Sequence, residues 1–136
     1  MKVLIDTNVT LDILLHRQDY PNAENIYLLA EKNKIVGYIS ASAVTDIFFL
    51  AKGELGKKPT IEALKKLLQV FIPATVTDSL IYQALYLDWN DFEDSVQYVV
   101  GESLEVDYIV TRNTSDYKTG SIPAVTPQEF ITLISE

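Results

Sequence analysis

Acidic residues at the boundaries of predicted elements are the feature of this sequence most able to do chemistry. Asp6 directly follows the apolar residues 3–5, and Asp46, Asp94 and Asp116 stand at other boundaries or on helices that can face the same edge of a sheet. Four converging carboxylates repel one another unless a hard cation such as Mg²⁺ or Mn²⁺ binds them through oxygen. The four aspartates therefore predict a divalent-metal site, although each one alone is more typical of a helix cap, a turn or a solvated surface.

The composition removes several other kinds of chemistry. The 136-residue chain has no cysteine, which excludes disulfides, thiolate metal sites and cysteine nucleophiles. Its single histidine, His16, is expected at the exposed end of the first helix, so neither a Ser-His-Asp triad nor a multi-histidine zinc site is expected. The net charge of -8 has the wrong sign for binding nucleic acid through the overall field. A polyanionic substrate therefore requires a bound cation or a local basic surface.

Alternating strands and helices must position these aspartates. Apolar runs predict strands at residues 2–5, 35–40, 74–76, 107–111 and 124–125. Helical spacing predicts helices at residues 8–17, 21–32, 43–52, 60–71, 78–88, 92–104 and 127–136, with Ser42 and Thr126 as caps, Thr77 or Asp78 opening the fifth helix, and a loop at residues 53–59. The aromatic residues in "IFFL", "LIYQALYLDW" and "SVQYVV" are expected mainly in the core or an interface, and not as stacking platforms for bases.

This order of elements predicts an α/β fold, a three-layer α/β/α sandwich with a mostly parallel central sheet, because parallel neighbours need crossover connections. The length is that of a single domain over residues 1–136. Asp6 and residues 111–113 directly follow predicted strands, at the edge where parallel sheets collect ligands. No apolar run approaches the roughly 18 residues of a membrane span, and no signal peptide is evident, so a cytoplasmic location without membrane partners is expected.

Five segments, taken in order, carry a family resemblance. They are "VLIDTNVTLDILLHR", "ISASAVTDIFFL", "DFEDSVQYVV", "DYIVTRNTSDY" and "IPAVTPQEF". Together they resemble the PIN domain, a family rich in metal-dependent ribonucleases that includes the toxins of VapBC-type toxin-antitoxin pairs. The resemblance spans almost the whole chain, and it implies the same three-layer fold.

The resemblance assigns roles to the aspartates one by one. Asp6, Asp94 and Asp116 match the first, third and fourth acids of the family's metal site. Asp46 matches the second acidic position, where many relatives have Glu, and its side chain is one methylene shorter. Contact with the metal through water is therefore expected at Asp46. All four carboxylates are expected to be catalytic.

Neighbouring polar residues match the family's supporting positions. Asn8 resembles the residue that orients the first aspartate, and Thr111 and Asn113 match the polar loop beside the fourth. Asp91 is expected either to assist the site or to cap the helix that carries Asp94. Asp12, one turn beyond Asn8, is expected at a solvated helix position.

Basic residues offer candidate contacts to the RNA backbone. Arg112 is expected to contact a phosphate or to form a surface ion pair. Lysines outnumber glutamates between residues 52 and 66, where Lys57 and Lys58 are the candidate phosphate contacts. The alternative for this segment is a solvated face without a ligand.

The resemblance implies an Mg²⁺- or Mn²⁺-dependent endoribonuclease, a hydrolase that leaves a 5′-phosphate and a 3′-hydroxyl. It also implies an antitoxin partner and a homodimer. The alternative function is a non-catalytic PIN-like module that binds RNA or protein. Two other acidic α/β classes fit less well, because a haloacid-dehalogenase-type phosphatase needs an aspartate where Asn8 stands and a receiver domain needs a lysine after a late strand.

Overall fold

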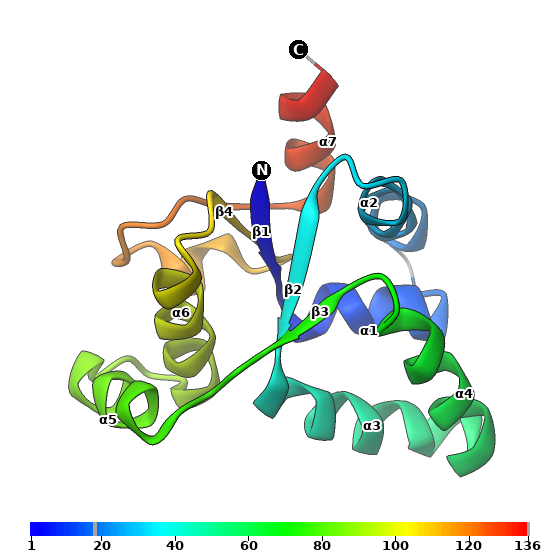
Figure 1. Ribbon diagram of the computed structural model, residues 1–136, viewed down its shortest axis with the longest axis horizontal. Coiled ribbons are helices and arrows are strands. Elements are labelled where there is room, and N and C mark those ends of the chain that lie inside the picture. The colour runs from blue at the N-terminus through cyan, green and yellow to red at the C-terminus, as the bar shows by residue number, and fades with distance from the viewer. Residues whose placement is uncertain (18, 136) are drawn as a thin grey trace.

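Five parallel strands form the middle layer of the computed structural model, which describes residues 1–17 and 19–135 (Figure 1). They are β1 (Lys2–Ile5), β2 (Val36–Ser40), β3 (Ile72–Ala74), β4 (Tyr108–Val110) and β5 (Ala124–Val125). Their order across the sheet is β3-β2-β1-β4-β5, and every neighbouring pair is parallel. The predicted three-layer α/β/α fold is confirmed, and its sheet is parallel throughout the described residues.

Both faces of the sheet are buried, which explains the apolar runs of its strands. Val3 and Ile5 of β1 pack into one core, whereas Leu4 between them packs into the other. The first core joins the sheet to α1 (Thr7–Leu15), α2 (Tyr20–Glu31), α3 (Ala41–Leu55), α4 (Lys57–Leu67) and α7 (Pro127–Ser135). The second joins it to α5 (Asp78–Leu87), α6 (Phe92–Leu104) and the 3₁₀ turn η1 (Thr114–Tyr117). Figure 1 shows these two helical layers on opposite sides of the sheet.

Most predicted helix starts are confirmed, and one predicted loop is wrong. Thr77 accepts a hydrogen bond from the Leu80 amide at the start of α5, and Thr126 accepts one from the Glu129 amide at the start of α7. Ser42 is not a cap, since α3 begins at Ala41 directly after β2. The predicted end of the last helix at Glu136 lies outside the described residues.

A single residue replaces the loop predicted at residues 53–59. Helix α3 continues to Leu55 and α4 begins at Lys57, so Gly56 alone separates them, with φ +84°. Glycine reaches this backbone region without the penalty that a Cβ imposes. The glycine therefore permits a sharp turn, which keeps α3 and α4 packed against each other on one face of the sheet.

Across residues 1–17 and 19–135, no helix has the length and apolar character needed to cross a membrane.

The strand order reverses between β1 and β4, and this position locates the site. From β1 the chain runs to β2 and β3 on one side, and it then returns to β4 and β5 on the other. Ligands of open parallel sheets bind beyond the carboxyl ends of the strands at such a switch point. Asp6 follows β1 and Thr111 follows β4, so both residues stand at this point.

Candidate active site

The Asp6 carboxylate is buried, and it is held by donors from three other segments. Gln97 Nε2 of α6 donates to Oδ1 over 3.0 Å. Thr111 Oγ1, just after β4, donates to Oδ2 over 2.7 Å, and the Tyr117 hydroxyl of η1 donates to the same oxygen over 3.1 Å. Hydrogen bonds of this kind offset the cost of removing a carboxylate from water. They explain how a charge can stand at the end of an apolar strand.

Asn8 joins this carboxylate to the loop that follows β4. Its Nδ2 lies 3.5 Å from Asp6 Oδ2 and 3.4 Å from Thr111 Oγ1, and its Oδ1 accepts a hydrogen bond from the Arg112 amide. The Asn113 amide in turn donates to Thr111 Oγ1 over 3.0 Å. The structure thus brings the predicted supporting residues together, with the backbone of Asn113 and not its side chain making the contact.

Asp94 is the second carboxylate at this point. It lies in the first turn of α6, and the Tyr117 hydroxyl that donates to Asp6 is 3.3 Å from Asp94 Oδ1. Partial burial raises the pKa of Asp94 to about 7, and the negative charges of Asp6, Asp91 and Asp116 add to this rise. The negative charges of Asp6, Asp91 and Asp116 therefore act on Asp94 together. Asp94 resists ionisation unless a positive charge compensates for them.

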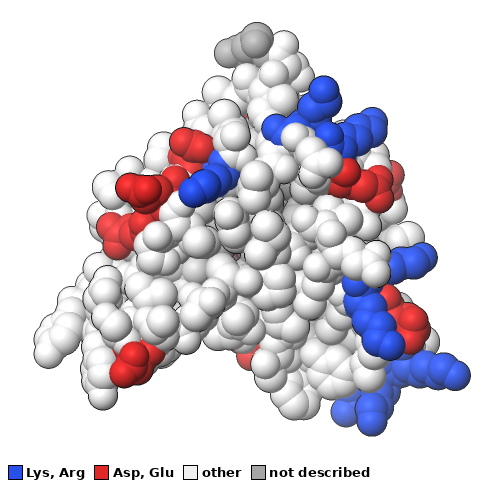
Figure 2. All heavy atoms as spheres, in the orientation of Figure 1, with Lys and Arg blue, Asp and Glu red and all other residues white. Residues whose placement is uncertain are grey.

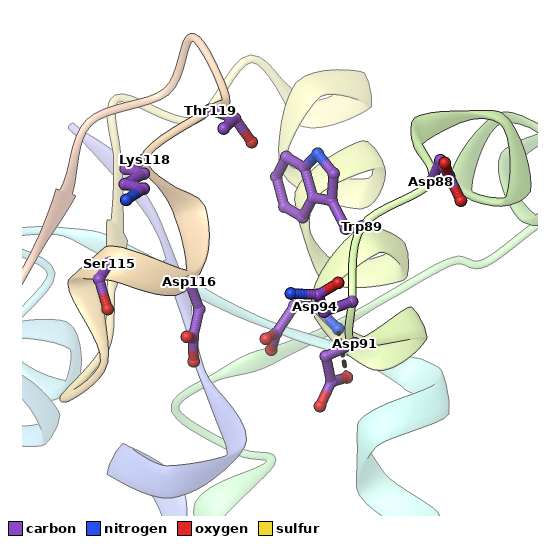
Figure 3. A pocket seen from close by; sticks show the side chains of 9 residues that line it. Asp88, Trp89, Asp91, Asp94, Ser115, Asp116, Lys118 and Thr119 are labelled. Atoms are coloured by element: carbon purple, nitrogen blue, oxygen red, sulfur yellow. Dashed lines mark hydrogen bonds between the residues drawn. The ribbon is translucent and has the colours of Figure 1, made fainter.

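Asp91 and Asp116 line a pocket next to Asp94, which has a volume of about 420 Å³ (Figure 3). Asp91 accepts a hydrogen bond from the Asp94 amide over 3.2 Å, so its predicted role as the cap of α6 is confirmed. Asp116 is exposed on η1, and Figure 3 shows its carboxylate pointing toward the floor of the pocket, across from Asp91 and Asp94.

Asp46 lies in a different part of the site. It is exposed on α3, and its charge contributes to raising the pKa of Glu93, after the larger effect of burial. Glu93 accepts a hydrogen bond from Thr7 Oγ1 over 2.9 Å. The nearby charge of Asp6 also contributes to the raised pKa of Glu93. Glu93 is thus an acidic neighbour of the site that the sequence did not reveal. The charges of Asp46 and Asp6 both raise its pKa.

Asp12 is buried, so the prediction of a solvated position is wrong. Arg112 Nε lies 2.9 Å from Asp12 Oδ2, and the Asp12 side chain is 1% exposed, whereas that of Arg112 is 42% exposed. Oδ2 nevertheless receives no hydrogen bond from any described residue, so the contact is a close charge pair without aligned hydrogen-bond geometry. Arg112, positioned after β4, provides the charge that allows Asp12 to be buried.

The basic residues are distributed unevenly around the molecule. Lys57 and Lys58 are exposed on α4, which packs on the opposite face of the sheet from α6. Figure 2 shows blue side chains gathered on the side where Figure 1 places α4, away from α5 and α6. The lysine that lines the acidic pocket is Lys118, which the sequence did not single out.

The donor set suits a hard divalent cation. Among residues 1–17 and 19–135, no three His, Cys, Asp or Glu side chains converge closely enough to form a metal-binding group. Mg²⁺ is often held by only one or two carboxylates, with water completing its coordination. Asp6 and Asp94, which share the Tyr117 hydroxyl, provide two such carboxylates. Asp116 lines the same pocket as Asp94. These oxygen ligands fit Mg²⁺ or Mn²⁺.

Sequence reasoning missed Gln97 and Tyr117, the residues that connect the acids. Both side chains are buried, with 1% of each exposed. Gln97 is three residues after Asp94, so helical spacing predicts both side chains on the same face of α6. This spacing is the sequence signal that could have identified Gln97. Tyr117 follows Asp116 directly and carried no comparable signal, because its role depends on how η1 folds over α6.

Comparison with known families identifies the relationship. The sequence model described as "PIN domain" matches residues 2–115 of the chain. No curated protein sequence matches the chain significantly.

Solved structures provide independent matches to the fold. VapBC2 from Rickettsia felis, bound to a DNA fragment of its promoter, superposes with a TM-score of 0.72 at 15% identity, covering 93% of this chain and 98% of that chain. A toxin-antitoxin complex from Klebsiella pneumoniae gives 0.70 at 20% identity over 92% and 97%. The Mycobacterium tuberculosis VapC20 toxin, described as cleaving the Sarcin-Ricin loop, gives 0.70 at 15% identity over 87% and 95%. At these identities, the superpositions establish a shared fold.

Proposed function

This chain belongs to the PIN domain family, and we propose that it is an Mg²⁺- or Mn²⁺-dependent endoribonuclease that acts as the toxin of a toxin-antitoxin pair. The observation that carries the proposal is the shared Tyr117 hydroxyl between Asp6 and Asp94 at the switch point of the sheet. Three structural neighbours are toxins or toxin-antitoxin complexes, and one is described as cleaving the Sarcin-Ricin loop. These descriptions support the proposal from outside the chain.

Asp6, Asp94 and Asp116 would hold the cation, with Asp46 contributing through water. When bound, such a cation lowers the pKa of a coordinated water and stabilises negative charge on the scissile phosphate. The overall hydrolysis would add water across the bond between phosphorus and the 3′ oxygen, which leaves a 3′-hydroxyl and a 5′-phosphate. No histidine is required as an acid or a base, consistent with the exposed place of His16.

The residues around Asp6 keep its carboxylate in one orientation. Gln97 fixes Oδ1, while Thr111 and Tyr117 fix Oδ2. Catalytic ligands depend on such outer contacts, and losing one typically costs about 10–100-fold in metal affinity or activity. Arg112, whose guanidinium is paired with Asp12, stays half-exposed at the same rim and is proposed to approach a substrate phosphate.

A non-catalytic binding module is the alternative, and one observation favours it. The Tyr117 hydroxyl lies within hydrogen-bond distance of both carboxylates, and no three acids converge within the described residues. A protein of this second kind would fold and bind its partner with the acids bridged by Tyr117 and no cation required. Cleavage separates the two functions.

The family relationship also supports protein partners. We propose an antitoxin and a second copy of the chain, and apolar side chains exposed on α3 and α5 supply surface for such contacts. These are Phe49 and Leu50 of α3 and Tyr82, Leu85 and Tyr86 of α5. Light scattering of the purified chain, alone and after co-expression with the protein encoded by an adjacent gene, would report both associations.

The decisive assay for the function uses end-labelled RNA of mixed sequence with Mg²⁺, Mn²⁺ or EDTA. The proposal predicts cleavage with either cation, no cleavage in EDTA, and fragments that carry a 5′-phosphate. Cleavage that continues in EDTA would contradict metal dependence. A folded chain that binds RNA but never cuts it with either cation would favour the binding module.

A further inference from the structure

Trp89, the single tryptophan of the chain, lies in the short segment between α5 and α6 and lines the acidic pocket. Its side chain is half-buried, with no assigned role in the proposed metal site. The sequence had placed the aromatic residues mainly in the core or an interface. An indole that remains accessible beside four pocket carboxylates requires a different explanation from one that fills a core.

The packing around Trp89 leaves part of the ring free. Tyr98 of α6 lies behind it, with ring centroids 4.9 Å apart and an angle of 46° between the planes. Tyr117 meets it edge-on, with centroids 6.1 Å apart at 80°. Figure 3 shows the indole in face view in front of α6, with Asp91 and Asp94 below it. The two tyrosines thus pack against the ring, which is only half-buried and also lines the pocket.

The remaining walls of the pocket suit a nucleotide. Its volume of about 420 Å³ is within the range of small-molecule sites, roughly 300–1,000 Å³. Lys118, directly after η1, lines the pocket across from Trp89 in Figure 3. A lysine can contact a phosphate of an RNA strand, and an aromatic face can stack against a base. The carboxylates could hold a cation at the scissile phosphate.

We propose that Trp89 is a stacking platform for one unpaired nucleobase of the RNA next to the scissile phosphate. The inference rests on the proposed ribonuclease function, and it adds one residue of this chain that would contact a base of the substrate. A paired base has both faces covered within the duplex, so it cannot lie against the indole. Stacking tolerates different bases because every base has a π face.

Trp89 fluorescence tests the inference in the unmodified protein, since no other tryptophan contributes. The protein is titrated in Ca²⁺, a hard oxygen-binding cation, with three RNAs of equal strand length. One is single-stranded, one has the same backbone with abasic sites, and one is annealed to its complement. We expect quenching by the single-stranded RNA and little response to the other two. Equal quenching by the abasic strand would overturn the stacking role.

Substitutions provide the second measurement. Trp89→Leu should weaken binding of the single-stranded RNA by about fivefold or more, the lower limit of the value of one stacked base, and should leave abasic RNA binding unchanged. Trp89→Phe should retain most of the affinity because it keeps an aromatic face. Tyr20→Leu, at a half-buried aromatic residue of α2 outside the pocket, is the matched control and should bind like the parent.

The outcomes separate this inference from the proposed function. Mg²⁺-dependent cleavage together with unchanged RNA affinity in Trp89→Leu would overturn the stacking role and leave the nuclease intact. Absence of cleavage by the parent in both Mg²⁺ and Mn²⁺ would remove the nuclease instead. If Trp89→Leu does not fold, the comparison of base-bearing and abasic RNA on the parent still decides the matter.

Discussion

The Tyr117 hydroxyl donates to Oδ2 of Asp6 over 3.1 Å, and the same oxygen lies 3.3 Å from Oδ1 of Asp94. One proton is therefore shared between two carboxylates that would otherwise face each other with like charge. This arrangement makes the metal-free site a closed hydrogen-bonded unit. A cation placed between the same carboxylates would take over the role of that proton.

Tyr117→Phe should therefore be more destabilising without metal than with it. Loss of a hydrogen bond to charged groups costs about 1.5–3 kcal/mol, and we expect that loss in EDTA but a smaller one in saturating Mg²⁺. Urea unfolding under both conditions measures the difference. Tyr98→Phe is the control, because the Tyr98 hydroxyl contacts Ser121 and Glu102 outside the acidic pair. An equal loss for Tyr117→Phe in EDTA and in Mg²⁺ would contradict the exchange.

The raised pKa of Asp94 predicts a pH dependence. The folded protein retains a proton on Asp94 up to a pKa of about 7, whereas the unfolded chain loses it near the ordinary aspartate pKa of 3.8. This contribution to stability is full below the lower value and is lost as the pH rises through the higher one. In EDTA, the unfolding free energy of the parent relative to Asp94→Asn should therefore fall between pH 5 and 8.

Asp78→Asn, at an exposed position in the first turn of α5, provides the control for that measurement. The parent relative to this variant should show a nearly constant difference over the same pH range. A constant difference for Asp94→Asn as well would show that Asp94 is ionised throughout.

Gln97 offers a test of positioning without a large loss of stability. Its Nε2 donates to Asp6, whereas its Oε1 is buried with no hydrogen-bond partner among the described residues. Gln97→Met removes a favourable contact and an unsatisfied oxygen together, and the two effects, each about 1–3 kcal/mol, should largely cancel. Cleavage should nevertheless fall about tenfold or more, because Asp6 loses its anchor.

Calorimetric Mg²⁺ titration of Gln97→Met gives a readout besides cleavage, and weaker binding is expected there too. Wild-type metal affinity and activity in the variant would show that Gln97 only fills space.

The sequence pattern predicted the strands and the residues at their ends, but it did not predict the hydrogen bonds within the site. Asp6 and Thr111 could be placed together because each follows a strand and the strands are parallel neighbours. Gln97 and Tyr117, which donate to Asp6, are separated from it by 91 and 111 positions in the sequence, so only the packed structure reveals these hydrogen bonds. Periodicity could not anticipate the burial of Asp12, since its partner Arg112 comes from the far end of the chain.

The basic surface divides in a similar way. Local sequence pointed to Lys57 and Lys58 because charges accumulate there, yet the pocket is lined by Lys118, which is isolated in sequence. Lys118→Gln should reduce the salt dependence of RNA binding by about one phosphate contact. The Lys57→Gln, Lys58→Gln double variant tests the other surface. An unchanged salt slope in that double variant would assign residues 57 and 58 to a solvated face.

The most direct test of the account is Asp6→Asn, which preserves the shape of the side chain and removes its charge. Cleavage of a mixed RNA pool in Mg²⁺ and Mn²⁺ is measured beside calorimetric metal titration and thermal melts in EDTA. The account predicts a folded variant with weakened metal binding and with cleavage reduced by about a hundredfold or more. A folded Asp6→Asn protein that binds Mg²⁺ and cuts RNA as the parent does would contradict it.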